Sequence, residues 1–390
     1  MKFAMTVNYC SPRAYEYLKT LFTMPSVQGI RQWLKVVKSW PEFTAEVLED
    51  LKVKHKNDTP RERLCSVVLD GMSIRKSKLD APSDRLIGFV DLGNSQGPIV
   101  ADNGPLATEA FLFMVVGVAA PWKMPFGYFL STGLSGEVLK NLVVEAICCI
   151  TECGLEVVAA VCDCLAANVP KAKLLSCRVH EHTFSHLKTF LPYKEDEVIC
   201  FIFDACHALK LLRNLLGDRL ALWGKNLWVL WKHIEALQEL QEKEGLRAAN
   251  KLSKAHIDYY QQIMKAKLAA KTFSSSVSKA LEFASLLKLP GYHGCKGTAK
   301  FVAIVERAFY LLDSSNPVAA GSKAPLLPST FTHQREVTEA AGQQLMELRL
   351  AHERRVAQDG RRMSVITMAF TLKSVSMLAE NLFDANLCKL

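Results

Sequence analysis

The sequence predicts an α/β core followed by an all-α region, with two short helices ahead of the core. Between Arg61 and Asp204, short runs of aliphatic and β-branched residues alternate with stretches of helical periodicity, which is typical of a mixed sheet covered by helices. After Asp204 the strand-like runs stop, and apolar residues recur every three or four positions, which indicates helices. The chain therefore combines two structural classes in one sequence.

The first segment has the outline of a helix-turn-helix. Ser11 and Pro12 provide an N-cap and a first-turn proline for a helix over 13–22, and the break at 23–26 caps a second helix over 27–38. On this second helix Arg31, Gln32, Lys35 and Lys38 lie away from the apolar positions, so a basic face could meet DNA. Any amphipathic surface helix would show the same pattern, and that alternative stays open.

The core should contain three strands, a helix, a strand, a helix and a strand. Strands are expected at 66–74, at 86–92, along the apolar stretch 110–130, at 157–162 and at 198–203, with helices at 135–153 and 168–175. This is the element order of a ribonuclease-H-like fold, in which the first and fourth strands are neighbours. The expected topology brings Asp70 of the first strand beside Asp163 of the fourth.

Asp70 and Asp163 are the candidate catalytic residues and metal ligands. Each lies at or near the end of an apolar strand, and Mg²⁺ or Mn²⁺ prefers carboxylate oxygens. Two such ions held by carboxylates can stabilise the attacking and leaving oxygens of a phosphodiester displacement. By spacing alone, each aspartate could equally cap a strand or begin a turn.

Helices are expected at 209–216, 227–242, 257–288 and 300–313 after Asp204, and again at 336–362 beyond a Pro-rich and Ser-rich linker. Trp223, Trp228 and Trp231 are expected to lie in the core of this helical region. The segment 291–298 resembles a phosphate loop, but its glycines and lysine do not follow the P-loop order, and no clear strand leads into it.

The composition is that of an ordinary globular protein with a mild positive charge. Lys and Arg number 48 against 39 acidic residues, a balance that suits a phosphate-bearing partner without proving one. No secretory signal and no membrane-spanning run is recognised, so we expect a soluble protein with reduced cysteines. A cluster of Cys and His side chains matches no zinc-finger spacing; its members are Cys162, Cys164, Cys177, His180, His182 and His186.

Eight ordered motifs resemble the P-element family of DNA transposases, including relatives with a THAP zinc domain. They are Y-C-S-P-R-A-Y-E-Y-L at 9–18, L-D-G-M-S-I-R at 69–75, G-F-V-D-L-G at 88–93, P-F-G-Y-F-L at 125–130, C-D-C-L-A-A-N at 162–168, F-D-A-C-H-A-L-K-L-L-R-N at 203–214, G-L-R-A-A-N-K-L at 245–252 and N-P-V-A-A-G-S-K-A-P-L at 316–326. Several are weak individually, but together and in this order they are specific.

The resemblance implies a helix-turn-helix at 9–55, a ribonuclease-H-like core at 61–206, a helical GTP-binding insertion at 207–335 and a helical segment returning to the core at 336–390. It also implies a nuclear enzyme that binds the terminal repeats of double-stranded transposon DNA as a homo-oligomer. Asp70 and Asp163 would be the first two acids of an Asp-Asp-Glu metal site, and GTP would be an assembly cofactor.

The sequence departs from the family pattern in three ways. The THAP domain is not recognised ahead of Tyr9, and the positions after the two aspartates are Gly71 and Cys164, where the family has an acid and a glycine. The catalytic Glu motif is not found, and Glu380 does not lie in such a motif. We therefore expect a truncated transposase of doubtful catalytic competence. A non-catalytic DNA-binding or repressor-like derivative and a degenerate reading frame without selected activity are the alternatives.

Overall fold

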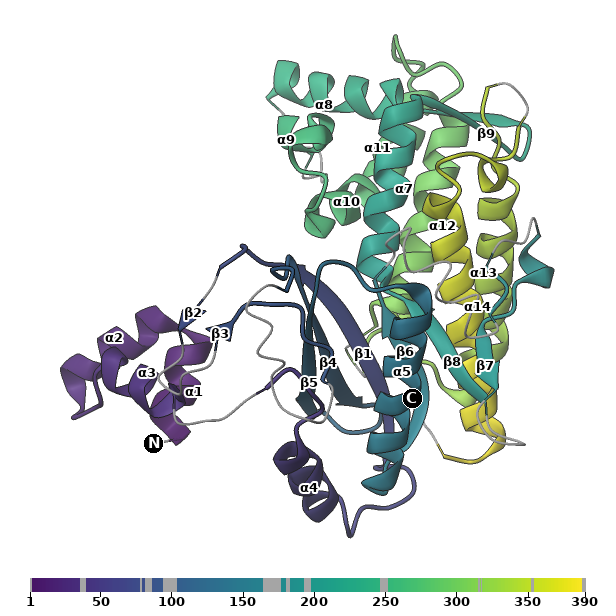
Figure 1. The fold of residues 1–390 in the computed structure, drawn as a ribbon. Coiled ribbons are helices and arrows are strands. Elements are labelled where there is room, and N and C mark those ends of the chain that lie inside the picture. Colours follow the sequence, from purple (N-terminus) through teal and green to yellow (C-terminus); the bar gives the residue numbers. More distant parts are fainter. Residues whose placement is uncertain are drawn as a thin grey trace.

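The computed structural model describes residues 2–35, 40–77, 79–80, 86–93, 104–163, 177–179, 183–192, 198–245, 252–314, 316, 318–351 and 354–387. Figure 1 shows a small N-terminal group of helices, a central sheet and a long helical part beside it. None of the helices in these ranges is long and apolar enough to cross a lipid bilayer.

The N-terminal unit has three helices rather than two. They are α1 (Lys2–Cys10), α2 (Pro12–Leu21) and α3 (Val27–Lys35). Ser11 caps α2 as expected, with its hydroxyl accepting from the amide of Ala14, and Ala4, Tyr15 and Ile30 form a buried centre with one residue from each helix. Helix α1 was not expected, because its hydrophobic periodicity is weak; Ala4 is its one buried side chain among those whose burial the structure describes.

Six strands form the central sheet, in the order β5-β4-β1-β6-β8-β7. The strands are β1 (Leu64–Ser73), β4 (Glu109–Gly117), β5 (Lys123–Ser131), β6 (Glu156–Cys162), β7 (Phe190–Pro192) and β8 (Val198–Phe203). Strands β1 and β6 are parallel neighbours, although about ninety residues separate them, and β6 is parallel to β8. The predicted adjacency of the first and fourth core strands is thus confirmed.

The second core strand differs from the expectation. Residues 86–92 contribute only β3 (Leu86–Ile87), which pairs with β2 (Leu79–Asp80) in a separate two-stranded sheet, together with isolated bridges at Phe89 and Asp91. The apolar stretch 110–130 instead supplies two strands, because the chain turns back after Gly117, whose amide donates to the carbonyl of Trp122 at 2.9 Å. A long apolar run therefore contained a hairpin, and the three antiparallel strands are β1, β4 and β5.

Two helices cover the inner face of the sheet. Helix α5 (Gly136–Glu152) and α4 (Ala45–Lys54) contribute to the main core together with the buried side chains Val67, Leu69, Phe113 and Val115 of the sheet. Phe43, ahead of α4, stacks on Phe126 with ring centroids 5.4 Å apart. Alternate residues of β1 face this core, so Asp70 points to the other side of the sheet.

The helical part begins at α7 (Ala205–Arg219) directly after β8. It contains a hairpin of β9 (Ala221–Gly224) and β10 (Leu227–Leu230), followed by α8 (Lys232–Glu244), α9 (Lys254–Ile257), α10 (Ala266–Thr272), α11 (Ser275–Leu286), α12 (Lys296–Leu312), α13 (Pro328–Met346) and α14 (Met363–Asp384). Short 3-10 turns lie at Phe184–His186, Tyr259–Gln261, Gly321–Lys323 and Val356–Gln358.

Three details of this region correct the sequence expectations. Residues 227–230 form a strand, the expected helix over 257–288 is split into short pieces, and α13 begins at Pro328, inside the expected linker. Among the tryptophans, Trp231 is buried as predicted, but Trp228 is 42% exposed on β10. A β-hairpin places every second side chain outward, which the helical interpretation did not anticipate.

Helix α14 lies against β8 and provides hydrogen-bond partners for the last residues of this strand. The hydroxyl of Thr371 accepts from the amide of Phe203 at 3.2 Å and donates to its carbonyl at 3.0 Å, and the hydroxyl of Ser374 donates to the carbonyl of Phe201 at 2.6 Å. Side chains of the helix thus satisfy strand groups that a neighbouring strand would otherwise bond. This contact joins the end of the chain to the strand that precedes the helical part.

Candidate functional site

Three aspartates lie at one level of the sheet, one inside β1 and the others directly after β6 and β8. Leu69 is the register partner of Cys162, and Cys162 is the register partner of Phe203. Asp70 comes one residue later inside β1, and Asp163 and Asp204 come directly after the last residues of β6 and β8, so all three occupy the same level of the sheet. The amide of Asp204 also donates to the carbonyl of Cys162 at 2.8 Å, which holds these two strand ends together.

Asp70 and Asp163 suit a metal site at this edge. Asp70 is exposed and Asp163 half-buried, and adjacent strands bring equivalent residues within about 5 Å of each other. Two carboxylates at that separation are the kind and number of protein ligands that Mg²⁺ usually receives. Among the described residues, however, no group of three His, Cys, Asp or Glu side chains is arranged to hold a metal ion.

Asp204 has a structural role that Asp70 lacks. Its carboxylate accepts from the amides of Cys206 at 3.0 Å and His207 at 3.1 Å, and so caps the N-terminus of α7. Burial, followed by the charge of Lys210, lowers the pKa of His207, whereas the carboxylates of Asp163, Asp204 and Asp70 act to raise it. His207 therefore lies in the electric field of all three aspartates.

The sequence prediction did not include Asp204 and His207 in the site. The available signal was the order of residues at 203–207, where an acid directly follows an apolar strand and a histidine follows three positions later. An acid in that position is also an ordinary helix cap, and the structure shows that it does act as one. Sequence alone could not separate the two roles.

Glu380 lies far from this edge. It is on α14, where its carboxylate pairs with Arg335 of α13 at 2.6 Å. Its neighbour Leu382 packs with Leu64 and Val158, near the N-terminal ends of β1 and β6. Because Asp70 lies six residues beyond Leu64 along β1 and Asp163 directly follows β6, Glu380 does not belong to their site.

The neighbourhood of Gly71 shows why a side chain at this position is restricted. A Cβ atom on Gly71 would lie 3.1 Å from the ring of Phe111, which is tighter than most side-chain contacts. An acidic side chain at this position, which the family usually has, would require the ring of Phe111 to shift. Gly71 therefore leaves the space that the Phe111 ring occupies. Cys164, the second departure, lies outside the described residues.

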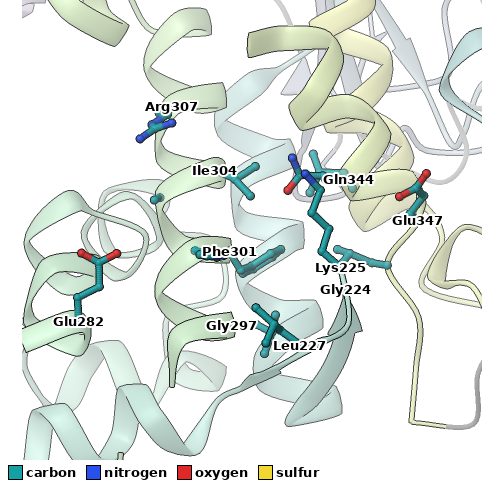
Figure 2. A pocket seen from close by; sticks show the side chains of 15 residues that line it. Gly224, Lys225, Leu227, Glu282, Gly297, Phe301, Ile304, Arg307, Gln344 and Glu347 are labelled. Atoms are coloured by element: carbon teal, nitrogen blue, oxygen red, sulfur yellow. The ribbon is translucent and has the colours of Figure 1, made fainter. Parts of the chain in front are cut away.

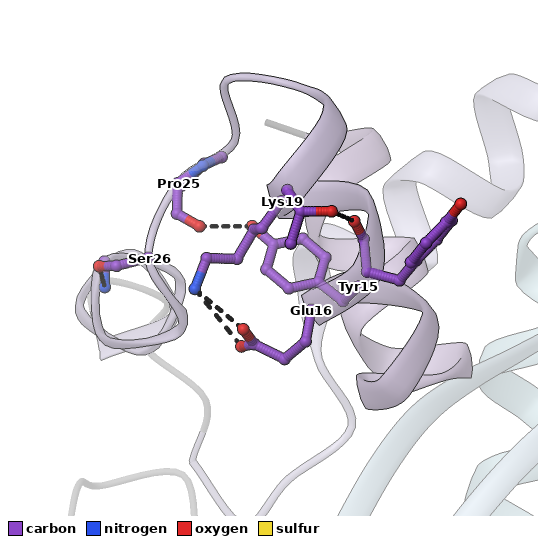
Figure 3. Close-up of polar contacts among 8 residues, drawn as sticks. Tyr15, Glu16, Lys19, Pro25 and Ser26 are labelled. Atoms are coloured by element: carbon purple, nitrogen blue, oxygen red, sulfur yellow. Dashed lines mark hydrogen bonds and ion pairs between the residues drawn. The ribbon is translucent and has the colours of Figure 1, made fainter.

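The N-terminal unit is held together by a hydrogen bond across its turn. Figure 3 shows the hydroxyl of buried Tyr15 donating to the carbonyl of Pro25 at 2.6 Å, just before α3 begins. Arg31 and Gln32 on α3 are exposed, as a nucleic-acid contact requires. The side chain of Lys35 and all of Lys38 lie outside the described residues.

The segment that resembles a phosphate loop has a packing role. Thr298 is fully buried, and its hydroxyl accepts from the amide of Leu230 at 2.9 Å and lies 2.8 Å from Nδ1 of His233. The threonine of a P-loop must instead face the bound nucleotide and its metal. This part of α12 therefore joins the helix to the β9–β10 hairpin.

The zinc hypothesis gains no support from the described cysteines. Cys162 and Cys177 are buried, and burial raises the pKa of the Cys177 thiol to about 12. Cys164, His180 and His182 lie outside the described residues.

Three family models match consecutive parts of the chain. They are described as "Transposable element P transposase-like, HTH domain" at residues 1–33, "TNP-like, RNase H N-terminal domain" at 40–176 and "TNP-like, GTP-binding insertion domain" at 206–325. Their order agrees with the three structural parts described above.

One curated relative and one solved structure resemble almost the whole chain. The chain is 28% identical over 385 residues to the human DNA transposase THAP9, covering 97% of this chain and 42% of that protein. It therefore spans less than half the length of this relative. The structure titled "Drosophila P element transposase strand transfer complex" matches with a TM-score of 0.76 at 20% identity, covering 99% of this chain and 80% of that chain. The chain belongs to the P-element-type transposase family.

Proposed function

We propose that the chain carries the catalytic machinery of a P-element-like DNA transposase and acts on phosphodiesters at transposon ends. The observation that carries this proposal is the register between β1 and β6, which puts Asp70 and Asp163 at one level of the sheet. The fold itself is shared with many other activities, so the site rather than the architecture supports the assignment.

Asp70 and Asp163 would hold Mg²⁺ or Mn²⁺. When bound, the metal activates a water or a DNA 3′-hydroxyl and neutralises charge on the phosphate. The protein's own contribution is to fix two carboxylates on rigid neighbouring strands, at an edge open to a large substrate because Asp70 is exposed. Burial lowers the pKa of His207, so its neutral ring would offer a hydrogen bond to a phosphate oxygen.

The partner in this proposal is double-stranded DNA of the transposon terminal repeats, bound by a homo-oligomer in the nucleus. Arg31, Gln32 and Lys35 would contact it from α3, together with Lys38, which lies outside the described residues, and the insertion matched by the GTP-binding model would bind GTP as an assembly cofactor. The net charge of +9 favours such a phosphate-rich partner.

The catalytic proposal is tested by an assay of metal-dependent nicking and strand transfer on terminal-repeat duplexes. Asp70→Asn and Asp163→Asn each remove one metal-binding charge and should lower the rate by about 100-fold or more, a loss of roughly 3 kcal/mol of transition-state stabilisation. Asp50→Asn, an exposed aspartate on α4, is the matched control. Equal activity in all four proteins would refute the assignment.

A second candidate function is DNA binding without catalysis. It is favoured by the finding that the carboxylate of Asp204, the third acid at this level of the sheet, accepts from the amides of Cys206 and His207 as the cap of α7. In that case mobility-shift assays would show binding that Arg31→Ala/Gln32→Ala weakens, while Asp70→Asn leaves it unchanged and no variant cleaves DNA. Arg13→Ala, an exposed arginine on α2, controls for a loss of charge alone.

A further inference from the structure

A loop with an apolar tip, residues 258–265, lies at the surface of the helical part between α9 and α10. Within it, Tyr260, Ile263 and Met264 are 63%, 46% and 65% exposed. Single exposed apolar side chains are ordinary, but three large ones on one short loop form a patch, and such patches mark surfaces that bind a partner. The 258–265 loop is therefore a candidate interaction surface.

A buried arginine holds the backbone of the 258–265 loop. The guanidinium of Arg213 on α7 donates from Nη2 to the carbonyls of Gln262 at 3.2 Å and Ile263 at 3.0 Å, and from Nε to the side chain of Asn214 at 2.7 Å. Arg213 is fully buried, and these partners are all uncharged. Burying a cation among neutral groups is costly. The contact fixes the loop in one conformation, as a preorganised binding surface requires.

A buried tyrosine fixes the start of the same loop. The hydroxyl of Tyr259 donates to Oδ1 of Asp218 at 2.7 Å, and its ring lies against Trp231 with centroids 5.3 Å apart. A Cβ atom on Gly217 would collide with this ring, so α7 accepts Tyr259 only because residue 217 is glycine. Tyr259 is thus held in the core, while the next residue, Tyr260, is turned out to solvent.

The apolar tip is flanked by positive charge. Lys254 on α9, Lys265 at the end of the loop and Lys267 on α10 are exposed, and Asp258 is the single acidic residue between positions 254 and 267. Three positive charges against one negative charge complement a polyanion. Exposed aromatic and aliphatic side chains beside lysines are the combination with which proteins bind nucleic-acid strands, because the bases stack on the former and the phosphates lie near the latter.

A cavity elsewhere in the helical part lacks this bias in charge. It measures about 420 Å³ and lies between the β9–β10 hairpin, α12 and the C-terminal end of α13, with Phe301 and Ile304 on one wall (Figure 2). Its charged lining residues are of both signs, namely Lys225, Lys300, Arg307, Glu282 and Glu347. These mixed charges do not select a polyanion, so the 258–265 loop is the better candidate for a surface that binds DNA.

We propose that the 258–265 loop is a second DNA contact of this chain, with Tyr260 and Met264 against base faces and the three flanking lysines on the adjoining phosphates. Base faces become accessible where a duplex is unstacked, at a kinked step or at a strand end. In Figure 1, α9 and α10 lie on the same side of α7 as the N-terminal helices. The inference rests on the proposed function, which supplies DNA as the partner but assigns its contacts to α3.

The base contact is tested by titrating the full chain, in EDTA to prevent cleavage, with terminal-repeat duplexes that carry 2-aminopurine at successive terminal positions. The wild type should increase the 2-aminopurine emission at the position that it unstacks. Tyr260→Ala/Met264→Ala should abolish this increase and weaken binding by about 100-fold, roughly tenfold for each stacked side chain. Phe283→Ala, 62% exposed on α11, removes apolar surface outside the loop and should behave like the wild type.

The phosphate contact has a separate readout in the salt dependence of the affinity. Lys254→Ala/Lys267→Ala should reduce the slope of log K against log salt concentration by about two, roughly one for each lost phosphate contact. Tyr260→Ala/Met264→Ala should leave this slope unchanged, because it removes no charge. Lys279→Ala/Lys288→Ala removes two exposed lysines outside the loop and should keep the slope of the wild type.

The outcomes separate the loop from the proposed function. If the wild type does not bind DNA, the DNA partner and the loop contact are both wrong. If Tyr260→Ala/Met264→Ala binds as tightly as the wild type with the same emission, the loop contact is wrong and the proposed function stands. If this variant is a monomer in sedimentation where the DNA-free wild type is a dimer, the loop binds a second copy and the DNA inference fails. The substituted side chains are all exposed, so thermal unfolding should match that of the wild type.

Discussion

Leu69 of β1 and Cys162 of β6 are register partners on parallel strands, and an aspartate follows each of them. Cys162 is in turn the partner of Phe203, which precedes Asp204. The positions of the three aspartates along their strands are therefore determined by backbone pairing within the sheet, not by flexible loops. Changes that disturb this pairing should act on all three carboxylates together.

Substitutions of Asp204 are expected to show whether its carboxylate caps α7, takes part in the site, or does both. Asp204→Ala removes the acceptor for the amides of Cys206 and His207 and should destabilise the protein by about 1 kcal/mol. Asp204→Asn keeps a good capping side chain but loses the charge, so stability should be close to that of the wild type. Chemical denaturation measures both variants, and a loss of nicking in Asp204→Asn at unchanged stability would show that its charge contributes to catalysis.

Thr371 is expected to be among the most sensitive positions of α14. Thr371→Val keeps the shape of the side chain but leaves the amide and carbonyl of Phe203 without their partner, which should cost about 2–4 kcal/mol. Thr332→Val on α13, where the side chain is exposed, should change the free energy of unfolding by less than about 0.5 kcal/mol. A similar small effect for both variants in urea titrations would show that the helix does not close the strand edge.

The sequence predicted the parts of the fold that depend on local pattern and element order. The runs around Val67 and Ala159 are β-branched or aliphatic and bounded by turns, and their order implied that Asp70 and Asp163 would be neighbours. It did not predict β9 and β10, because Leu227, Leu230 and Ile234 recur at helical spacing.

The reason lies in the turn that creates the hairpin. Lys225 and Asn226 both adopt positive φ in a two-residue loop. Asn-Gly or Asp-Gly is the usual sequence of such a turn, and this loop contains neither. The contact between Thr371 and Phe203 joins residues 168 positions apart and left no local signal. Likewise, nothing in the sequence distinguished the capping role of Asp204 from a metal-binding one.

Stability is expected to fall on mild acidification, in part because of His233. Burial lowers its pKa below the ordinary 6.5, against the opposing effect of the carbonyl of His293. Between the two pKa values the unfolded chain binds more protons than the folded chain, so the free energy of unfolding decreases as the pH falls below about 6.5, and it levels off below the folded-state pKa.

The slope from this single group is at most about 1.4 kcal/mol per pH unit. Burial also lowers the pKa of His256 and His207, so the total slope should be steeper. Urea denaturation of the wild type and of His233→Gln between about pH 7 and pH 5, the range in which histidine titrates, measures this slope. An unchanged slope in the variant would show that His233 does not contribute.

Tyr15 is expected to control the position of the proposed DNA-contacting helix. Tyr15→Phe removes the 2.6 Å hydrogen bond to the carbonyl of Pro25 and leaves that carbonyl without its tyrosine partner, at a cost of about 1–2 kcal/mol. Because Pro25 lies two residues before Val27, the first residue of α3, the same change should loosen the helix that carries Arg31 and Gln32. Mobility-shift assays should then show weaker binding to terminal-repeat DNA, although Tyr15 is buried and cannot touch DNA itself. Tyr17→Phe, on the same helix but 65% exposed, removes an identical hydroxyl without this contact and should leave both stability and affinity unchanged. If Tyr15→Phe lowers stability and DNA binding is retained, α3 is not the helix that binds DNA.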